Sequence, residues 1–109
     1  MALYMTRAKL SNEAFKGYVE NPSDRETALQ KLTAGLGMTM HKMYFSVSTA
    51  EIVTIAEGTA AAMAAAEMVI GSSGTTTGIE VIELIDSKSM TAAMETANKV
   101  VSAYQAPNK

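Results

Sequence analysis

The chain has 109 residues, enough for one domain with a modest core. Hydrophobic residues make up 48% of it and charged residues 18%, a globular composition that excludes a disordered chain. The net charge is -2, with lysines and arginines scattered singly, so we expect no nucleic-acid partner.

Cysteine is absent, which excludes disulfides and thiol chemistry and suits a reducing compartment. The N-terminus, Met1 to Arg7, lacks the basic region and long apolar run of a signal peptide. The longest apolar stretch, Ala60 to Ile70, contains Glu67 and is too short to cross a bilayer. We therefore expect a cytoplasmic protein that does not bind membranes.

The first third of the chain predicts one strand and two helices. The strand is expected over residues 3–8, followed by a helix that Ser11 or Asn12 can cap, since either side chain accepts from an unpaired amide. Pro22 interrupts this helix and is predicted to open a second one, which glycines at 35 and 37 end. The apolar stripes of the two helices are Ala14, Phe15, Tyr18 and Val19, then Ala28, Leu29, Leu32 and Leu36.

The remainder predicts three strands and two helices. Two strands are predicted over residues 39–47 and 50–57, joined by a tight hairpin at Ser48-Thr49. A fourth strand is predicted over residues 76–85. Thr59 can cap a helix that continues to about Gly71. Asp86 or Ser87 can cap a last helix, whose apolar stripe is Met90, Ala93, Met94, Ala97, Val101 and Tyr104.

This order predicts an α+β, ferredoxin-like βαββαβ domain over residues 1–105, with an extra C-terminal helix and a frayed tail at 106–109. The fold has a four-stranded antiparallel sheet with helices on one face. The segments 52–57 and 79–85 carry apolar side chains on both strand faces, whereas a sheet with one wet face alternates more cleanly. We therefore expect the open face to be covered, most simply by another copy of the chain.

Several short segments resemble one known family. They are Tyr4-Met5-Thr6, Asn21-Pro22-Ser23-Asp24-Arg25, Leu36-Gly37 and Tyr44, and together they resemble the GYD domain family over about residues 3 to 100. The Gly-x-Tyr-Asp signature of that family falls near Ser48 to Glu51 and is largely missing, with Ser48, Ala50 and Glu51 in its place. The resemblance implies a ferredoxin-like fold of the dimeric α/β-barrel type, in which two sheets pair through their open faces, and no established activity.

Three residues are candidates for catalysis: His41, Tyr44 and Glu80. His41 is the single histidine, so a general base near neutral pH would fall on it, and we expect it to share a strand face with Met43. Glu80 and Glu83 lie on opposite faces of the fourth strand, so one of them must point towards an apolar surface, where its pKa would rise. Tyr44 suits a pocket wall or an interface equally. The alternative for all of them is a structural role in the core, at an edge or at an interface.

Tyr4 and Met43 are candidates for ligand contact, although the nine methionines more simply fill the core. With one histidine and no cysteine we expect no metal site, and nothing points to a cofactor. The first hypothesis is a small homo-oligomeric ligand-binding or assembly module with a small hydrophobic ligand. The second is a cofactor-independent enzyme, monooxygenase- or isomerase-like, acting on a small hydrophobic or aromatic substrate. A weaker third is a trimeric signalling-type module that pairs sheet edges.

Overall fold

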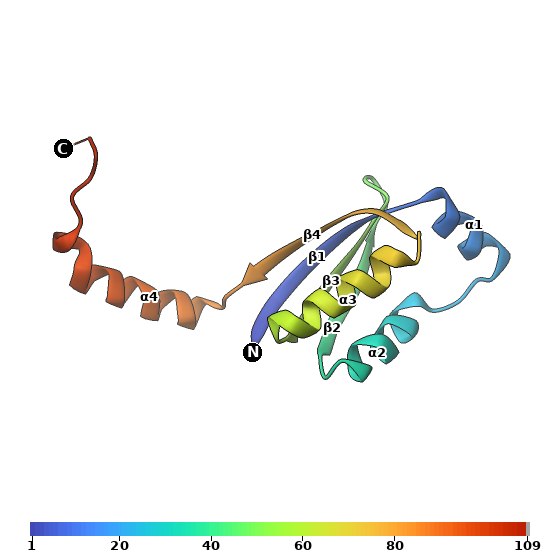
Figure 1. Ribbon diagram of the computed structural model, residues 1–109, viewed down its shortest axis with the longest axis horizontal. Helices are drawn as coiled ribbons and strands as arrows, with labels where there is room; N and C mark the ends of the chain where they lie inside the picture. Colours follow the sequence, from blue (N-terminus) through green and yellow to red (C-terminus); the bar gives the residue numbers. More distant parts are fainter. Residues whose placement is uncertain (109) are drawn as a thin grey trace.

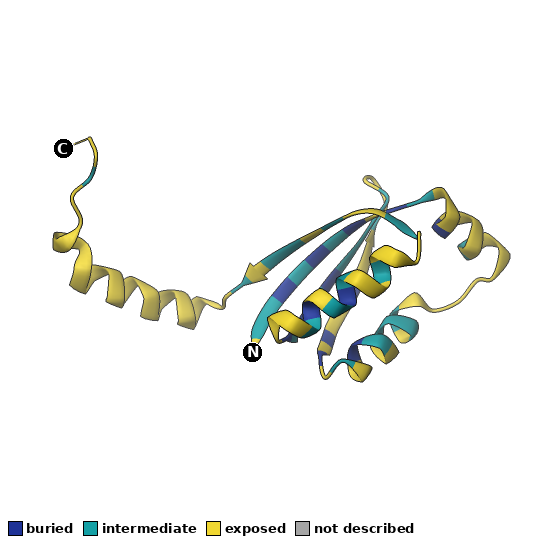
Figure 2. Ribbon diagram, viewed as in Figure 1, coloured by how far each residue is buried: buried dark blue, intermediate teal, exposed yellow. Residues whose placement is uncertain are grey.

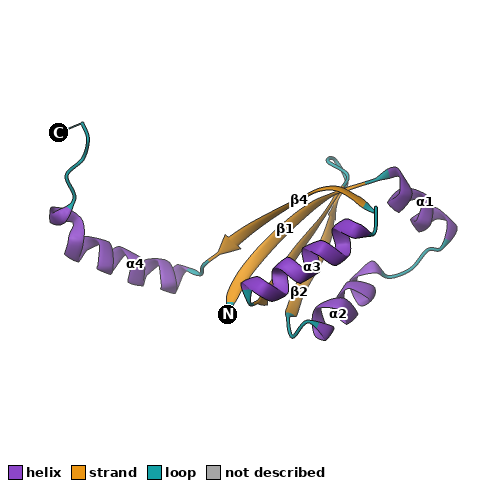
Figure 3. Cartoon of the chain, viewed as in Figure 1, coloured by secondary structure: helices purple, strands orange, loops and turns teal. Residues whose placement is uncertain are grey.

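The computed structural model describes residues 1–108. Its elements are β1 Ala2–Leu10, α1 Asn12–Glu20, α2 Arg25–Gly35, β2 Thr39–Ser46, β3 Glu51–Gly58, α3 Ala60–Ser72, β4 Thr76–Leu84, α4 Ser87–Val100 and a short 3-10 helix, Val101–Ala103. All strand pairs are antiparallel, in the order β2-β3-β1-β4, and α2 and α3 cover one face of the sheet (Figure 1 and Figure 3). The predicted ferredoxin-like βαββαβ arrangement with a C-terminal helix is confirmed.

The helix starts follow the side chains that can cap them. Ser11 caps α1 by accepting from the Ala14 amide at 3.2 Å, and Thr59 caps α3 through the Ala62 amide at 3.1 Å. The predicted start of α2 at Pro22 is wrong, because Asp24 caps that helix by accepting from the Glu26 amide at 3.0 Å. The Asp24 carboxylate satisfies a free amide of the first turn, so the first helical residue is Arg25, and Pro22 lies before the helix.

The β2–β3 hairpin is wider than the predicted two-residue turn. Strand β2 ends at Ser46 and β3 begins at Glu51, so residues 47–50 form the connection. Within it the Ser46 hydroxyl binds both the amide and the hydroxyl of Thr49, at 3.4 Å and 2.6 Å. Ala50 has a φ of 55°, a left-handed conformation that residues other than glycine rarely adopt.

The core lies between the sheet and the helices α2 and α3. It is built from Tyr4, Met38, Met40, Met43, Ala56, Met63 and Ala66 (Figure 2). Four of its seven members are methionines, whose flexible side chains fill irregular space, so the expected core role holds for them. The predicted stripe of α1 is used only in part, because Ala14 is buried while Phe15 and Val19 are exposed.

The other sheet face, which we call the open face, has no helix against it. The strand registers place there an apolar set that includes Leu3, Met5, Val53, Ile55, Ile82 and Leu84. The charged side chains of Arg7, Glu51, Glu57 and Glu80 share this face. Strands β3 and β4 therefore do carry aliphatic side chains on both of their faces, as their sequences predict.

Helix α4 projects away from the rest of the protein. It follows β4 after only Ile85 and Asp86, and Asp86 caps it by accepting from the Ser89 amide at 2.7 Å. All 14 of its residues are exposed, and the chain reaches 60 Å along its longest axis (Figure 2). The predicted helix to Tyr104 ends at Val100, with residues 106–108 in a loop; Lys109 of the predicted tail lies outside the described residues.

Candidate functional site

An apolar cavity of about 280 Å³ lies between the sheet and the two covering helices. Strand residues form its floor, from all four strands, and α2 and α3 form its walls. The floor includes Thr6, Ala8, Met40, Met43, Ile52, Thr54, Ala56, Thr76 and Ile79, and the walls include Ala28, Leu29, Leu32, Met63, Ala66, Val69 and Ile70.

The cavity exists because small side chains meet where the two layers face each other. Ala8 and Ala56 on neighbouring strands are 5% and 4% exposed, and Ala66 on α3 is 3% exposed. Alanine side chains are too short to fill the space between the two layers at these positions. Leu29 of α2 and Met63 of α3 are among the larger side chains that line it.

Thr6 and Thr76 line this cavity, and the hydroxyl oxygens of both are buried without a hydrogen-bond partner. Thr6 lies in the middle of β1, directly opposite Thr54 on β3. Thr76 pairs with Leu10, four residues further along β1, so the two hydroxyls mark positions about 13 Å apart along the strand. The hydroxyl of Thr33, also in the lining, is by contrast satisfied by the Leu29 and Gln30 carbonyls of its own helix.

Polar side chains from α1, α2 and α3 also contribute to the lining. The guanidinium carbon of Arg25 lies 6.0 Å from the centre of the Tyr18 ring, within the range of a cation–π contact. Tyr18 in turn packs edge-on against Phe45, with ring centres 6.1 Å apart. Among the described residues that line the cavity, Arg25 and Glu67 are the charged ones. The cavity therefore offers hydrogen bonding and shape, with charge confined to these two side chains.

His41 lies elsewhere than its strand alternation predicts. The β2–β3 register skips a residue between Met40 and Lys42, so a bulge changes the face on which the following side chains point. His41 Nε2 lies 3.0 Å from a carboxylate oxygen of Glu57, on the open face, while Met43 is buried on the helix-covered face. The expectation that His41 and Met43 share a face is therefore wrong.

Tyr44 and Glu80 are also on the open face, and they do not converge with His41. Tyr44 pairs with Val53, Val53 with Arg7, and Arg7 with Glu80, so this pair spans the sheet from one edge strand to the other, about 14 Å. His41, beside Glu57, lies four residues along β3 from that row, about 13 Å away. The three candidates thus form no common site within one subunit.

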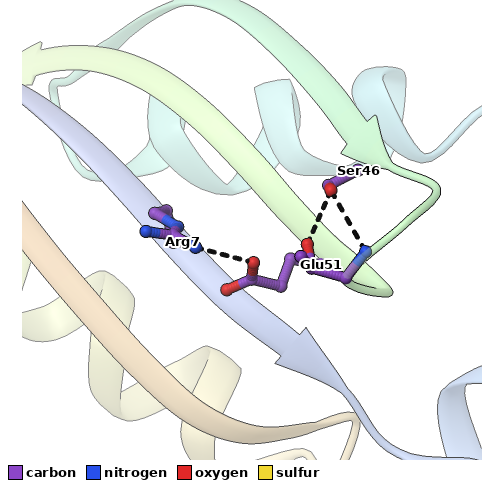
Figure 4. Close-up of polar contacts among 4 residues, drawn as sticks. Arg7, Ser46 and Glu51 are labelled. Carbon is purple, nitrogen blue, oxygen red and sulfur yellow. Dashed lines mark hydrogen bonds and ion pairs between the residues drawn. The ribbon is translucent and has the colours of Figure 1, made fainter.

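The polar centre of the open face is an ion pair between β1 and β3. Arg7 Nη2 lies 2.9 Å from Glu51 Oε1 (Figure 4). Hydrogen bonds from Thr49 and Arg7 lower the pKa of the Glu51 carboxyl from its ordinary value. The hydrogen bond to Glu51, with a smaller contribution from the charge of Glu80, raises the pKa of Arg7. Arg7 therefore stays charged between two carboxylates.

Of the two predicted ligand-contact residues, Met43 lines the cavity, and Tyr4 is buried in the adjoining core. The threonines were missed by sequence reasoning, although a signal for them exists. Thr6 alternates with Tyr4 and Ala8, and Thr54 with Ile52 and Ala56, so each is a polar residue on a strand face that must be buried. Such a residue needs a partner.

Residues 1–108 contain neither a metal-binding cluster nor a membrane-spanning helix. No three His, Cys, Asp or Glu side chains are grouped so as to hold a metal ion. No helix in the same range is both long and apolar enough to span a membrane.

Comparison with known proteins matches most of the chain to one family. None of the curated proteins with which the chain was compared matches it. The match to the GYD domain covers residues 4–94, which takes in the sheet except for the first two residues of β1, the cavity and the first half of α4. The protein therefore belongs to the GYD domain family.

Proposed function

We propose that this GYD domain protein is a binding module for a small, largely apolar molecule that carries one hydrogen-bonding group. The ligand would occupy the cavity beneath α2 and α3, with its polar group at Thr6. The observation that carries the proposal is the Thr6 hydroxyl, which is buried without a hydrogen-bond partner beside a largely apolar cavity. A buried hydroxyl without a partner costs roughly 1–3 kcal/mol, and a ligand group bonded to it would remove that cost.

The size and lining of the cavity support a ligand of this kind. Its 280 Å³ lies just below the roughly 300–1,000 Å³ of pockets that hold drug-sized ligands, so the ligand should be smaller than these. Four methionines, at 38, 40, 43 and 63, line it and can adapt to different shapes.

The test compares 2-naphthol with naphthalene, which share an aromatic body but differ by one hydroxyl. Fluorescence titration of the unmodified protein should show that 2-naphthol binds about fivefold more tightly, as one neutral hydrogen bond of roughly 1 kcal/mol provides. Thr6→Val should remove that preference and leave naphthalene binding unchanged. Thr76→Val is the matched control, since it removes the other unpartnered hydroxyl and should keep the preference.

Both variants should unfold at equal or higher denaturant concentration than the unmodified protein, because each removes an unpaired buried hydroxyl. No saturable binding of either probe would contradict the proposed function. Loss of the preference in Thr76→Val and its persistence in Thr6→Val would contradict the placement of the polar group.

The enzyme alternative is less well supported than binding. A cofactor-independent enzyme needs converging acid or base groups beside its substrate. His41, Tyr44 and Glu80 lie on the opposite face of the sheet from the cavity and apart from one another. Turnover of a small aromatic substrate that is lost in His41→Ala, with binding in the cavity retained, would favour that alternative.

We also propose that the open face associates with a second copy of the chain. Six apolar side chains lie on it without any covering element, and a face of this kind in water favours pairing with another apolar surface. A reducing cytoplasm is the location that we propose, since the chain has no cysteine to oxidise.

A further inference from the structure

We infer that α4 is an exchanged arm, which packs its apolar stripe against a second copy of this chain. The inference rests on the proposed self-association and adds to it a second, separate contact. It concerns a surface that neither the cavity nor the open sheet face includes.

The apolar stripe of α4 has no partner in its own chain. Met90, Ala93, Met94 and Ala97 follow the spacing of one helix face, and Val101 continues it just beyond the helix end. The opposite face carries Lys88, Ala92, Glu95 and Lys99. Met90 and Met94 are 47% and 57% exposed, and Val101 is 67% exposed. An isolated helix of this length is only marginally stable in water, so α4 needs a surface to pack on.

Its own domain does not provide that surface. The helix-covered face of the sheet is already occupied by α2 and α3 (Figure 1). The connection from β4 is two residues long, and its Asp86 caps α4, which sets the helix on a course away from the sheet (Figure 1). In domain-swapped dimers, each subunit extends an element away from its own domain and packs it on the other subunit. The short connection before α4 gives this arrangement.

The area of the open face also indicates that the arm takes part. Four strands of about eight residues make this face roughly 19 by 26 Å, or about 500 Å². A stable dimer buries about 800 Å² from each partner. The α4 helix of each copy would add a footprint of roughly 20 Å by 10 Å, or about 200 Å². The surface on which the partner's helix lands would add about 200 Å² more. Together with the open face, each copy would contribute about 900 Å².

The arm follows the open face directly along the chain, which makes a second copy the simplest occupant of both surfaces. Ile82 and Leu84 lie on the open face, Ile85 is 57% exposed in the connection, and Met90 follows on the arm. A two-fold axis would pair the two open faces and bring each uncovered helix to the other copy, so that the same contacts form in both directions.

Photo-crosslinking of the full chain tests this without assuming where the arm lands. The chain has no cysteine, so Met94→Cys gives a single attachment point for a benzophenone maleimide. Irradiation should give a covalent dimer on a denaturing gel, and mass spectrometry of the product should join the α4 peptide to a peptide of another copy. Ala92→Cys, on the opposite face of α4, is the matched control and should give several-fold less dimer.

Sedimentation velocity of the unlabelled protein separates the possible failures. A monomer at all concentrations would overturn both self-association and the exchanged arm. A dimer in which Met94→Cys crosslinks no better than Ala92→Cys would leave self-association in place and overturn the arm. Crosslinks from position 94 confined to the same chain would also overturn it, because α4 would then fold back on its own domain.

A charge on the stripe gives a second measurement. Met94→Lys should raise the dissociation constant of the dimer at least tenfold, because the lysine would lose its water on docking. Glu95→Lys, on the polar face, should change it by less than threefold. Met94 lies outside the core, so neither change should unfold the domain. Equal effects of the two substitutions would contradict the inference.

Discussion

Glu51 shows how one side chain links the hairpin to the central strand. Its carboxylate lies between Thr49 of the preceding turn and Arg7 on β1, with which it forms an ion pair, and hydrogen bonding to these two residues lowers its pKa. The folded chain therefore holds the proton on this group less tightly than the unfolded chain does. The stability that results is complete above the pKa of the unfolded chain and is lost as the pH falls through the lowered, folded-state pKa.

Glu51→Gln tests this linkage. The unmodified protein should be more stable than the variant at neutral pH, and the difference in unfolding free energy should shrink towards zero as the solution becomes acidic. Urea unfolding at a series of pH values measures it, with Glu20→Gln at the end of α1 as the control for loss of one charge. A difference that grows on acidification would show that the sign is wrong.

At position 58 the neighbouring side chain leaves room only for glycine. Gly58 is buried at the end of β3, and a Cβ atom added there would lie 2.7 Å from Cγ of Met38, closer than packed carbon atoms approach. Gly58→Ala should therefore lower the free energy of unfolding by about 1–3 kcal/mol, the usual effect of overpacking.

Two comparisons isolate the clash with Met38. Gly78→Ala adds a methyl group to β4 where nothing lies within 4 Å, so it should leave the stability unchanged or slightly higher. In a Met38→Ala background the penalty of Gly58→Ala should largely disappear, because the two positions are in contact. If the penalty persisted in that background, the clash would not be its cause.

At the scale of elements, capping determines where α3 begins over the sheet. Thr59 accepts from the Ala62 amide and sits directly after β3, so it sets the register in which Met63 and Ala66 face the cavity. Thr59→Ala should lower the free energy of unfolding by about 1 kcal/mol, and Thr59→Ser, which keeps the acceptor, by only a few tenths. Thermal unfolding followed by circular dichroism measures both, and equal losses in the two variants would argue against a capping role.

The β2 edge shows why an element can depart from its sequence pattern. Its bulge follows Met40, and the Met43 amide beyond it donates to Glu26 of α2 at 2.9 Å. This contact satisfies an edge-strand donor and ties α2 to the sheet. Strict alternation of side chains along β2 would place His41 and Met43 on the same sheet face. The extra residue of the bulge places them on opposite faces. The Met43–Glu26 contact joins residues that are 17 apart in the chain, and a local sequence pattern does not show such a contact.

At the scale of the whole molecule, three surfaces in one chain are incompletely packed: the cavity, the open face and the stripe of α4. A domain of about 100 residues buries a modest fraction of its surface and gains stability by association. The proposed pairing would cover the open face and the arm together and leave the cavity to the ligand. Self-association and ligand binding can therefore be measured separately.

From the sequence came the element order, the α+β class, the family resemblance and the candidate caps, which were Ser11 or Asn12, Thr59, and Asp86 or Ser87. These features follow from periodicity and from side chains acting on amides a few residues away. The sequence also determined that β3 and β4 have two apolar faces, because alternation in a strand is a local property.

The tertiary structure alone decided the site. The cavity depends on alanines from two strands and a helix meeting in space, and the structure alone shows that the buried Thr6 hydroxyl has no hydrogen-bond partner. The separation of His41, Tyr44 and Glu80 likewise follows from strand order and a bulge, which pair segments far apart in the chain. Contacts between segments that are far apart in the chain fix the position of each of these side chains, and a local sequence pattern does not show such contacts.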